Sequence, residues 1–448
     1  MQLLSSSDVA RDTVAAVQRR LTWILSLSML VAMMDRNNVN LAALKMNEAL
    51  GLTATQLGAG LSAFYVAYLA ATIPSNVLLN RFGARRWIAR IMITWGMVCA
   101  VSAFVWNPIS FYTVRFGLGL AEAGFLPGVL LYLTRWVPED ARGRMNSYFL
   151  TAIPISGVVT AVVSGYILKF DGMMSLSGWQ LIFVLEAAPA IVLGVIVLLY
   201  LDDRPEDASW LSPTQKSWLA RTLAEEERLG DAHRAPRSVL QTLGLLLARP
   251  AFAALLLAYF LFNFALAALV WIPQILQGFA LPPFQNSLLT AVPAAGAVVI
   301  MIGAARSSDR SRERRWHFLA TTCLCTIGYL LAAYPSHSLI QTVCGLVLAS
   351  GGAFAGLAVF WTLPPMFLRE IERPVGMGLV TTIGVIAGML SPLIMGRLKD
   401  LMGNYSVALL IGAILPLLGG LIVVGLLKAR AVDEPKGQFP GDSHVPNH

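Results

Sequence analysis

The stretch FYTVRFGLGLAEAGFLPGVLLYLTRW, residues 111–136, is long and apolar enough to cross a bilayer, yet it contains the opposite charges Arg115 and Glu122. Seven positions apart on a helix, they share nearly one face and are separated by about 10 Å along the axis. A charge near the membrane centre costs at least about 2.5–3.5 kcal/mol, so such residues usually face a protein interior or a wet cavity. One explanation is a structural ion pair that locks neighbouring helices. A functional site is favoured, because apolar residues would pack those helices without this cost.

The first apolar segment carries a second charged pair. Residues 21–34 are uncharged but too few to span a membrane, so the helix must continue and bring Asp35 and Arg36 into the bilayer. With a rise of about 1.5 Å per residue, Asp35 reaches nearly the same depth as Arg115. We therefore expect Asp35 to pair with Arg115, and Arg36 to extend toward Glu122.

Two acids and two arginines sum to zero charge, which suits a binding site better than a channel ring. Protonation of Asp35 or Glu122 would free an arginine to bind a substrate carboxylate in bidentate geometry. Deprotonation would return the acid to that arginine and expel the anion. The two acids are thus the candidate proton-coupling residues, either of which can titrate, and Arg36 and Arg115 are the candidate substrate-binding residues.

Other residues inside the apolar segments are weaker candidates. Some could line a cavity as hydrogen-bonding or stacking groups, although helix packing is the simpler use of a lone aromatic; these are Tyr65, Tyr68, Asn263, Trp271, Gln274 and Trp361. Glu186 lies near the outer end of the sixth segment, where we expect an interfacial position or a gate contact rather than a proton carrier.

The composition supports a polytopic membrane protein. The 448 residues are 56% hydrophobic and only 13% charged, with a mean hydropathy of +0.67, whereas soluble domains carry about 25% charged residues. The net charge of +8 follows from basic cytoplasmic loops and does not indicate a nucleic-acid partner. The four cysteines lie in apolar segments and predict neither disulfides nor a metal site. No cofactor is expected.

Twelve apolar segments can be marked along the chain: 21–44, 57–79, 87–106, 109–136, 145–168, 179–201, 251–279, 287–305, 318–335, 339–367, 374–396 and 405–427. An even number places both termini on one side. Of the 33 Lys and Arg residues, 27 fall on that side on this map, which predicts that both termini are cytoplasmic.

The chain divides into two halves. A tail (1–20) precedes a six-helix half (21–201), and a charged central loop (202–250) with a surface helix leads to a second half (251–427) and a tail (428–448). The central loop is interpreted as a linker.

An internal repeat supports this division. NRFGARRW (80–87) recurs as DRSRERRW (309–316), 229 positions on, each copy directly after the second segment of its half. Two parallel six-helix repeats follow from equivalent loops at equivalent places.

Several motifs resemble the anion:cation symporter family of the major facilitator superfamily. They include DRNNVNLA (35–42), YVAYLAATIPSN (65–76), RFGLGLAEAGFLPG (115–128), RSSDRSRERRWH (306–317) and FWTLPPMFL (360–368). The likeness covers nearly all spans and is similar in detail to the bacterial branch of tartrate, phthalate and 4-hydroxyphenylacetate transporters. It implies an all-α membrane protein with twelve transmembrane helices in two pseudo-symmetric halves.

The resemblance also implies roles for individual residues. Asp35, Arg36, Arg115 and Glu122 match the family's proton-coupling and anion-binding positions, and Tyr68 and Trp361 match its cavity-lining positions. Gating or structural roles fall to residues of the two repeated loops: Arg81, Gly83, Arg85, Asp309, Arg310 and Arg314.

The chain departs from the family pattern in two places. Asn80 stands where many facilitators have an aspartate, which makes that gate contact neutral. Thr381, Val385 and Ile153 replace amide residues that bind sugar hydroxyls in some members. This loss favours a less hydroxylated or aromatic carboxylate.

The sequence thus predicts a monomeric secondary transporter of a bacterial inner membrane that imports a small organic anion together with protons or sodium. A sugar-acid symporter, an exporter or an anion exchanger of the same fold stays open. A membrane-embedded enzyme is disfavoured, because GxxxxGK[ST] and HExxH motifs are absent from the sequence. An uncoupled channel would not need acids paired with arginines inside one half.

Overall fold

The computed structural model describes residues 6–232, 238–311, 313–334 and 338–433. Within these ranges it is built from helices and contains no strand. Twelve helical stretches are long and apolar enough to cross a membrane, in agreement with the twelve segments expected from the sequence. The protein is therefore a multi-pass membrane protein.

The first half contains α1 (Ser6–Leu50), α2 (Ala54–Phe82), α3 (Ala84–Val101), α4 (Pro108–Glu122), α5 (Phe125–Thr134), α6 (Glu139–Ile167) and α7 (Gly178–Tyr200). The central segment contains α8 (Pro213–Ala232) and α9 (Val239–Leu247). The second half contains α10 (Pro250–Ala268), α11 (Ile272–Gln277), α12 (Pro283–Ser311), α13 (Arg315–Ala333), α14 (Leu339–Phe360), α15 (Pro364–Phe367), α16 (Arg373–Met402) and α17 (Ser406–Asp433). Single 3-10 turns lie at Ser102–Phe104, Leu168–Phe170, Met173–Ser175, Pro205–Asp207, Leu269–Trp271 and Glu370–Glu372.

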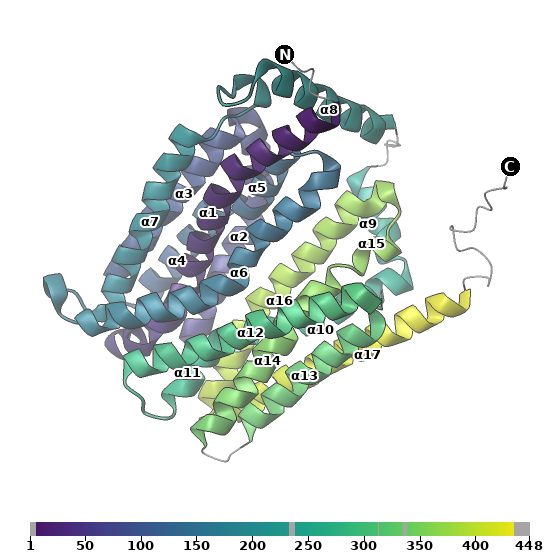
Figure 1. Ribbon diagram of the computed structural model, residues 1–448. Coiled ribbons are helices and arrows are strands. Elements are labelled where there is room, and N and C mark those ends of the chain that lie inside the picture. Colours follow the sequence, from purple (N-terminus) through teal and green to yellow (C-terminus); the bar gives the residue numbers. More distant parts are fainter. Residues whose placement is uncertain (1–5, 233–237, 312, 335–337, 434–448) are drawn as a thin grey trace.

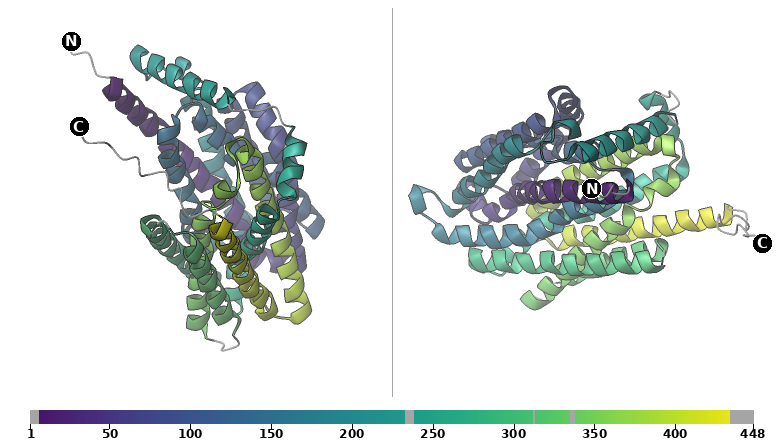
Figure 2. Two further views of the ribbon diagram at one scale, coloured as in Figure 1. Left: turned by 90° about the vertical axis from the view of Figure 1, so that its right-hand side faces the viewer. Right: turned by 45° about the horizontal axis from the view of Figure 1, so that its top comes forward.

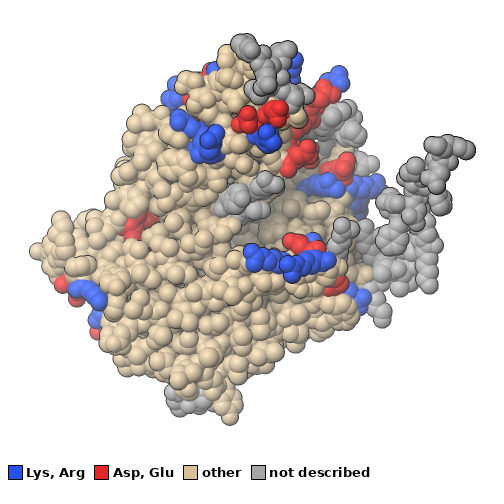
Figure 3. Space-filling model, viewed as in Figure 1, with Lys and Arg blue, Asp and Glu red and all other residues tan. Residues whose placement is uncertain are grey.

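The two halves lie side by side, with α8 across one end of the first half (Figure 1). The beginning of α1 and the end of α17 lie at this same end of the bundle, which Figure 2 shows from two further sides. We call it the termini side, and the opposite end the far side. Charged side chains gather mainly at these two ends, with a broad, mostly uncharged belt between them (Figure 3).

Two helices differ from the expected segments. The first helix begins at Ser6, so most of the predicted tail continues the first span as helix. The fourth span is broken into α4 and α5 at Gly124, where φ is +88°. Gly124 suits this break because it adopts positive φ readily and because a Cβ there would lie 2.4 Å from the Ser75 hydroxyl oxygen.

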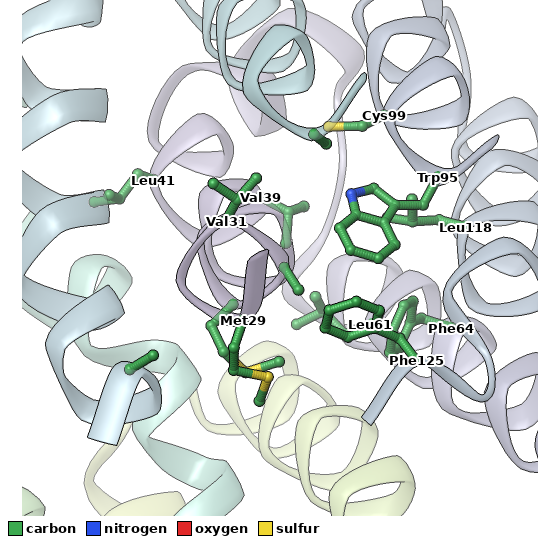
Figure 4. Packing of buried hydrophobic residues seen from close by; sticks show 14 of the residues in the cluster. Met29, Val31, Val39, Leu41, Leu61, Phe64, Trp95, Cys99, Leu118 and Phe125 are labelled. Carbon is green, nitrogen blue, oxygen red and sulfur yellow. The ribbon is translucent and has the colours of Figure 1, made fainter. Parts of the chain in front are cut away.

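Large apolar side chains fill the first half. Trp95 of α3 is fully buried and meets the ring of Phe125 edge to face, with 4.9 Å between the centroids. Trp95 and Cys99 both extend from α3 toward the helix that carries Val31 and Val39 (Figure 4). Since lipid tails are as apolar as these side chains, such packing depends on close contact rather than on exclusion of water.

The halves contact each other toward the far side. Gln274 Nε2 donates to the Asn40 carbonyl at 2.6 Å, and the Asp400 carboxylate accepts from the backbone N–H groups of Ala54 and Thr55 at 3.1 and 2.7 Å. Ser62 Oγ donates to the Met389 carbonyl at 2.5 Å.

Small residues make this seam tight. A Cβ on Gly58 would lie 2.3 Å from the carbonyl oxygen of Pro392, and one on Gly396 would lie 2.3 Å from that of Ala54. The hydrogen bonds that join these residues of the two halves all lie in the far-side half of the bundle. The structure is therefore closed on the far side.

Candidate functional site

The ion pair expected between Arg36 and Glu122 is present. One guanidinium nitrogen of Arg36 on α1 hydrogen-bonds to Oε1 of Glu122 at the end of α4. The Glu122 side chain is only 3% exposed, whereas 25% of the Arg36 side chain is exposed. Arg36 thus pairs with Glu122, while part of the Arg36 side chain remains accessible.

The expected pair between Asp35 and Arg115 is not formed. Asp35 is buried and accepts a hydrogen bond from the indole N–H of Trp95 at 2.7 Å, with Cys99 Sγ 3.8 Å from its other oxygen. Among the described residues it has no ion-pair partner within 4.0 Å. The prediction was wrong because successive helix positions differ by about 100°: as Arg36 faces α4, Asp35 turns toward α3.

Arg115 is a buried cation that has no acid partner within 4.0 Å among the described residues. It is 3% exposed, and its Nε and Nη1 atoms have no hydrogen-bond acceptor among the described residues. Its guanidinium carbon lies 5.2 Å from the ring centroid of Phe64, and that of Arg36 lies 5.1 Å from the same ring. Both guanidinium groups therefore flank one aromatic side chain of α2.

The arginines lie where the first half meets the second. The guanidinium carbon of Arg36 is 5.2 Å from the Tyr68 ring centroid, and Tyr68 is partly exposed. Tyr65, one turn earlier on α2, reaches α16, since a Cβ on Gly388 would lie 3.3 Å from its ring. This face of α2 is thus turned toward the second half.

The remaining expected binding residues are spread over the second half. Trp361 is partly exposed and meets the ring of Tyr259 edge to face at 5.8 Å. Asn263 Nδ2 donates to the Gly384 carbonyl at 2.7 Å, and Gln274 is part of the far-side closure. In this conformation the last two are engaged with backbone and are not brought to the arginines.

Glu186 is placed differently from expectation. It is 3% exposed inside the first half and accepts a hydrogen bond from Ser164 Oγ of α6 at 2.5 Å. The expectation of an interfacial or gate position was wrong, because this face of α7 packs against α1, α3 and α6. The signal that could have identified it is a lone acid in an otherwise apolar span.

The repeated loops each fold back on their own half. Gly83 has φ +88°, and a Cβ there would lie 2.8 Å from Asp203, whose carboxylate also accepts from the Arg85 backbone N–H at 2.9 Å. In the other copy, Arg314 pairs with Asp309 at 2.9 Å. The side chains of Arg81 and Arg310 are exposed.

Four of the five histidines (His233, His337, His444 and His448) lie outside the described residues. His317 stands at the start of α13, where its ring contacts Glu313 at 2.9 Å.

Twelve spans in two halves, with ionic side chains buried in one half and turned toward the other, are the architecture of a membrane transporter. The pattern of the Major Facilitator Superfamily matches residues 25–392. An Agrobacterium vitis protein with the name "Putative tartrate transporter" is 38% identical over 430 residues, which cover 95% of each chain. A Pseudomonas putida protein named "Putative metabolite transport protein NicT" is 37% identical over 428 residues, which cover 94% of this chain and 96% of that one.

Solved structures show the same fold. A crystal structure of a bacterial homologue of the human lysosomal transporter Spinster, in an inward-facing and unoccupied conformation, superposes with a TM-score of 0.70 at 18% identity, over 94% of this chain and 96% of that chain. The protein belongs to the major facilitator superfamily, in its anion:cation symporter-like branch. It is a transporter and not an enzyme.

Proposed function

We propose that this protein imports a small organic carboxylate together with protons by alternating access of its two halves. The observation that carries the proposal is Arg115: a buried guanidinium with two N–H-bearing atoms that lack acceptors among the described residues. Burying an unpaired charge is costly, and a carboxylate that accepts from these atoms would remove much of that cost. Arg36, partly exposed 5.1 Å from the same Phe64 ring, provides a second guanidinium for the same anion.

Proton coupling follows from the Arg36–Glu122 pair. While Glu122 is ionised it occupies Arg36, and an incoming carboxylate must compete with it. Protonation of Glu122 neutralises it and releases Arg36 for the substrate. Release of the proton restores the pair and weakens the hold on the anion. Asp35, which lies one residue from Arg36, is the second acid in this scheme.

The substrate class is supported by the name of a relative and by three side chains, those of Thr381, Ile153 and Val385. Tartrate appears in the name of the Agrobacterium relative. Thr381 donates its hydroxyl to the Met377 carbonyl of its own helix at 2.9 Å, and Ile153 and Val385 offer no hydrogen-bonding group. We therefore favour a tartrate-, phthalate- or 4-hydroxyphenylacetate-like carboxylate over a sugar acid.

We place the protein in a bacterial inner membrane, and the closure on the far side supports an inward-facing state. If the termini side is the cytoplasm, as the excess of Lys and Arg there favours, the binding site opens toward the cytoplasm in this conformation. The residues of the repeated loops would then close the termini side in the opposite state. A monomer is sufficient for this cycle, because each chain contains both halves.

The proposal is tested first by binding. The purified protein is screened by thermal shift against tartrate, phthalate, 4-hydroxyphenylacetate, gluconate and a neutral amide analogue of each. A carboxylate that raises the melting temperature, while its amide does not, supports the anion site. If no carboxylate of this panel raises the melting temperature of the wild-type protein at any pH, the proposal fails.

Coupling is tested by transport. In proteoliposomes, the best-binding carboxylate should accumulate when the outside is acidified. Glu122→Gln should still exchange labelled substrate across the membrane but should lose accumulation driven by the pH gradient. Unchanged accumulation in this variant would remove Glu122 from the coupling scheme. A sodium gradient that drives uptake at constant pH would replace the proton by sodium.

A further inference from the structure

Glu186 of α7 is a second buried acid, which the binding scheme above does not use. Its Oε1 accepts from Ser164, but its Oε2 is buried and has no hydrogen-bond donor among the described residues. An ionised group without partners in such surroundings is destabilised by the loss of its hydration. A carboxyl group that carries a proton avoids this destabilisation.

Asn38 of α1 is the second polar neighbour of Glu186, and its amide N–H group can donate to the Glu186 carboxyl group. Its side-chain amide lies beside the Glu186 carboxyl group and is fully buried. Its Nδ2 contacts Cys99 Sγ at 3.6 Å, whereas its Oδ1 has no donor within the described part of the chain. Glu186 Oε2 and Asn38 Oδ1 thus share a buried polar pocket, in which neither oxygen has a hydrogen-bond donor of acceptable geometry among the described residues. A proton on Glu186 supplies one.

The pocket continues to the substrate site through Cys99. The Cys99 Sγ atom lies 3.8 Å from Asp35 Oδ1 and 3.7 Å from the Phe183 carbonyl oxygen, one turn before Glu186. Cys99 thus connects Asp35 to the turn of α7 that precedes Glu186, and two like charges so near each other would oppose each other's ionisation.

The charged groups around the pocket come from α4. The nearest are Glu122, which lies close to Asp35, and Arg115, which lies close to Cys99. Neither Asp35 nor Glu186 has an ion-pair partner within 4.0 Å among the described residues. The pair is therefore better satisfied with one shared proton than with two negative charges.

The other end of the pocket adjoins the seam between the halves. Ser164 is followed by Gly165, where a Cβ would lie 2.8 Å from the Cβ of Ser287 on α12. This contact lies near the far-side end of α6, which finishes at Ile167. Opening of the far side must separate α6 from α12 here, next to the hydroxyl group that holds Glu186.

We propose that Glu186 is a second proton-binding site, loaded from the far side when the α6–α12 seam opens, and that it exchanges this proton with Asp35. In the exchange, the O–H bond on Glu186 breaks and one forms on Asp35, and the negative charge moves the opposite way. The inference deepens the proposed proton symport and rests on it for its purpose in transport. The protonation of Glu186 itself does not depend on any substrate.

Infrared spectroscopy tests the protonation directly on the purified, substrate-free protein. Protonated carboxyl groups absorb separately from carboxylates, so Glu186→Gln should remove one protonated-carboxyl band at neutral pH. Glu48→Gln is the matched control, because Glu48 is an exposed acid at the far-side end of α1, and it should leave that band unchanged. An unchanged band in Glu186→Gln would show that Glu186 is ionised and would overturn the proposal.

Glu186→Gln should fold well, since the amide still accepts from Ser164 and adds a donor for Asn38. If it does not fold, Ser164→Ala is the second variant. It removes the hydrogen bond that stabilises the ionised form, so the protonated band should persist to higher pH than in the wild type; a band that disappears at the same or lower pH contradicts the proposal.

Transport then tests the exchange with Asp35. With a carboxylate that the wild type accumulates, Glu186→Gln should reduce pH-driven accumulation, because the proton relay is lost. We expect a reduction of about tenfold, which corresponds to about 1.4 kcal/mol. Exchange of labelled substrate should continue. Wild-type accumulation would overturn the relay. If the wild type moves no carboxylate, the proposed function fails, while the infrared result still decides whether Glu186 holds a proton.

Discussion

The two halves share one topology but bury different chemistry. The spans of the first half bury Asp35, Arg115, Glu122 and Glu186, whereas within the described spans of the second half the buried charged residue is Glu372, at the termini-side start of α16. The interior of the second half is otherwise polar only through hydroxyl and amide groups. This contrast indicates that the first half provides the ionisable groups for anion binding and proton transfer. The second half forms the opposite wall of the site and takes part in the far-side closure.

The contrast extends inside the first half, where the two arginines stand in opposite electrostatic situations. Arg36 has an acid partner in Glu122, and Arg115 has none among the described residues. The same substitution at the two positions should therefore have the same effect on transport and opposite effects on stability. This difference gives the largest expected effects.

Arg36→Ala and Arg115→Ala should each reduce carboxylate uptake by about 100-fold or more, since a charge-assisted contact to the anion is lost. Arg36→Ala should also destabilise the protein by about 3–5 kcal/mol, because it leaves Glu122 buried without its partner. Arg115→Ala removes an unpaired buried charge, so its melting temperature should equal or exceed that of the wild type.

Uptake in proteoliposomes and thermal unfolding in detergent measure the two effects. Arg306→Ala, an exposed arginine on the termini side of α12, is the matched control and should change neither. The double variant Arg36→Ala with Glu122→Gln should regain much of the lost stability without regaining uptake. Wild-type uptake in both single variants would remove the arginines from the anion site.

Much of the fold was predictable from the sequence, because the length and apolarity of a span are constrained by the bilayer itself. The twelve spans and the repeat that divides them needed no coordinates. The level of each charge in the membrane followed from the helical rise, which is why the Arg36–Glu122 pair was predicted correctly.

The rotation of side chains around each helix was less accessible. Asp35 was expected to meet Arg115, but the choice between α3 and α4 depends on how the helices are rotated, and Trp95 offers a hydrogen bond on the other side. The break at Gly124 was missed for a related reason: only its neighbour Ser75 shows that a side chain has no room there. Hydropathy also does not distinguish an acid near the membrane surface from one buried beneath it, as Glu186 demonstrates.

The buried acid of the second half has a structural role, which a stability measurement can separate from transport. Arg249 binds both oxygens of Glu372, at 2.7 and 2.6 Å, and so joins the start of α10 to the start of α16. Glu372→Gln should destabilise the protein by about 1–3 kcal/mol, toward the lower end because a third of the Arg249 side chain is exposed. Substrate affinity should stay unchanged.

The control for this prediction is Glu370→Gln, two residues away. The Glu370 carboxylate is 75% exposed and 3.8 Å from Arg373, so its loss should leave the melting temperature almost unchanged. A fall in substrate affinity in Glu372→Gln, with little change in stability, would give the second half a charge function and weaken the division between the halves.

The far-side closure joins the halves through hydrogen bonds rather than ion pairs, so its individual contacts should have moderate effects. Gln274→Ala removes the buried bond to the Asn40 carbonyl and should favour the far-side-open state by about 0.5–1.5 kcal/mol, a few-fold change in population. Labelling of a cysteine at Asn47→Cys, in a variant without other reactive cysteines, by an impermeant maleimide should become faster. Gln277→Ala, which removes a longer bond of 3.2 Å to the Leu44 carbonyl, should accelerate labelling less. Equal rates in all three proteins would mean that these amides do not hold the far side closed.

The smallest expected effect lies in the repeated loops. One copy carries the acid Glu313 at the position where the other copy has Ala84. Partial burial alone would raise the pKa of Glu313, but hydrogen bonds from the backbone N–H of Trp316, at 2.7 Å, and from His317 outweigh it and lower that pKa. A lowered folded-state pKa stabilises the protein above the unfolded value of about 4.3, and this gain is lost as the pH falls through the folded-state pKa. Since Glu313 is a third exposed, Glu313→Gln should lower the melting temperature only slightly at pH 7, and the difference from the wild type should disappear in acid. A difference in melting temperature that persists or grows in acid would show that the ionised Glu313 carboxylate does not stabilise its loop. The two loop copies would then be stabilised in the same way, although only one of them carries this acid.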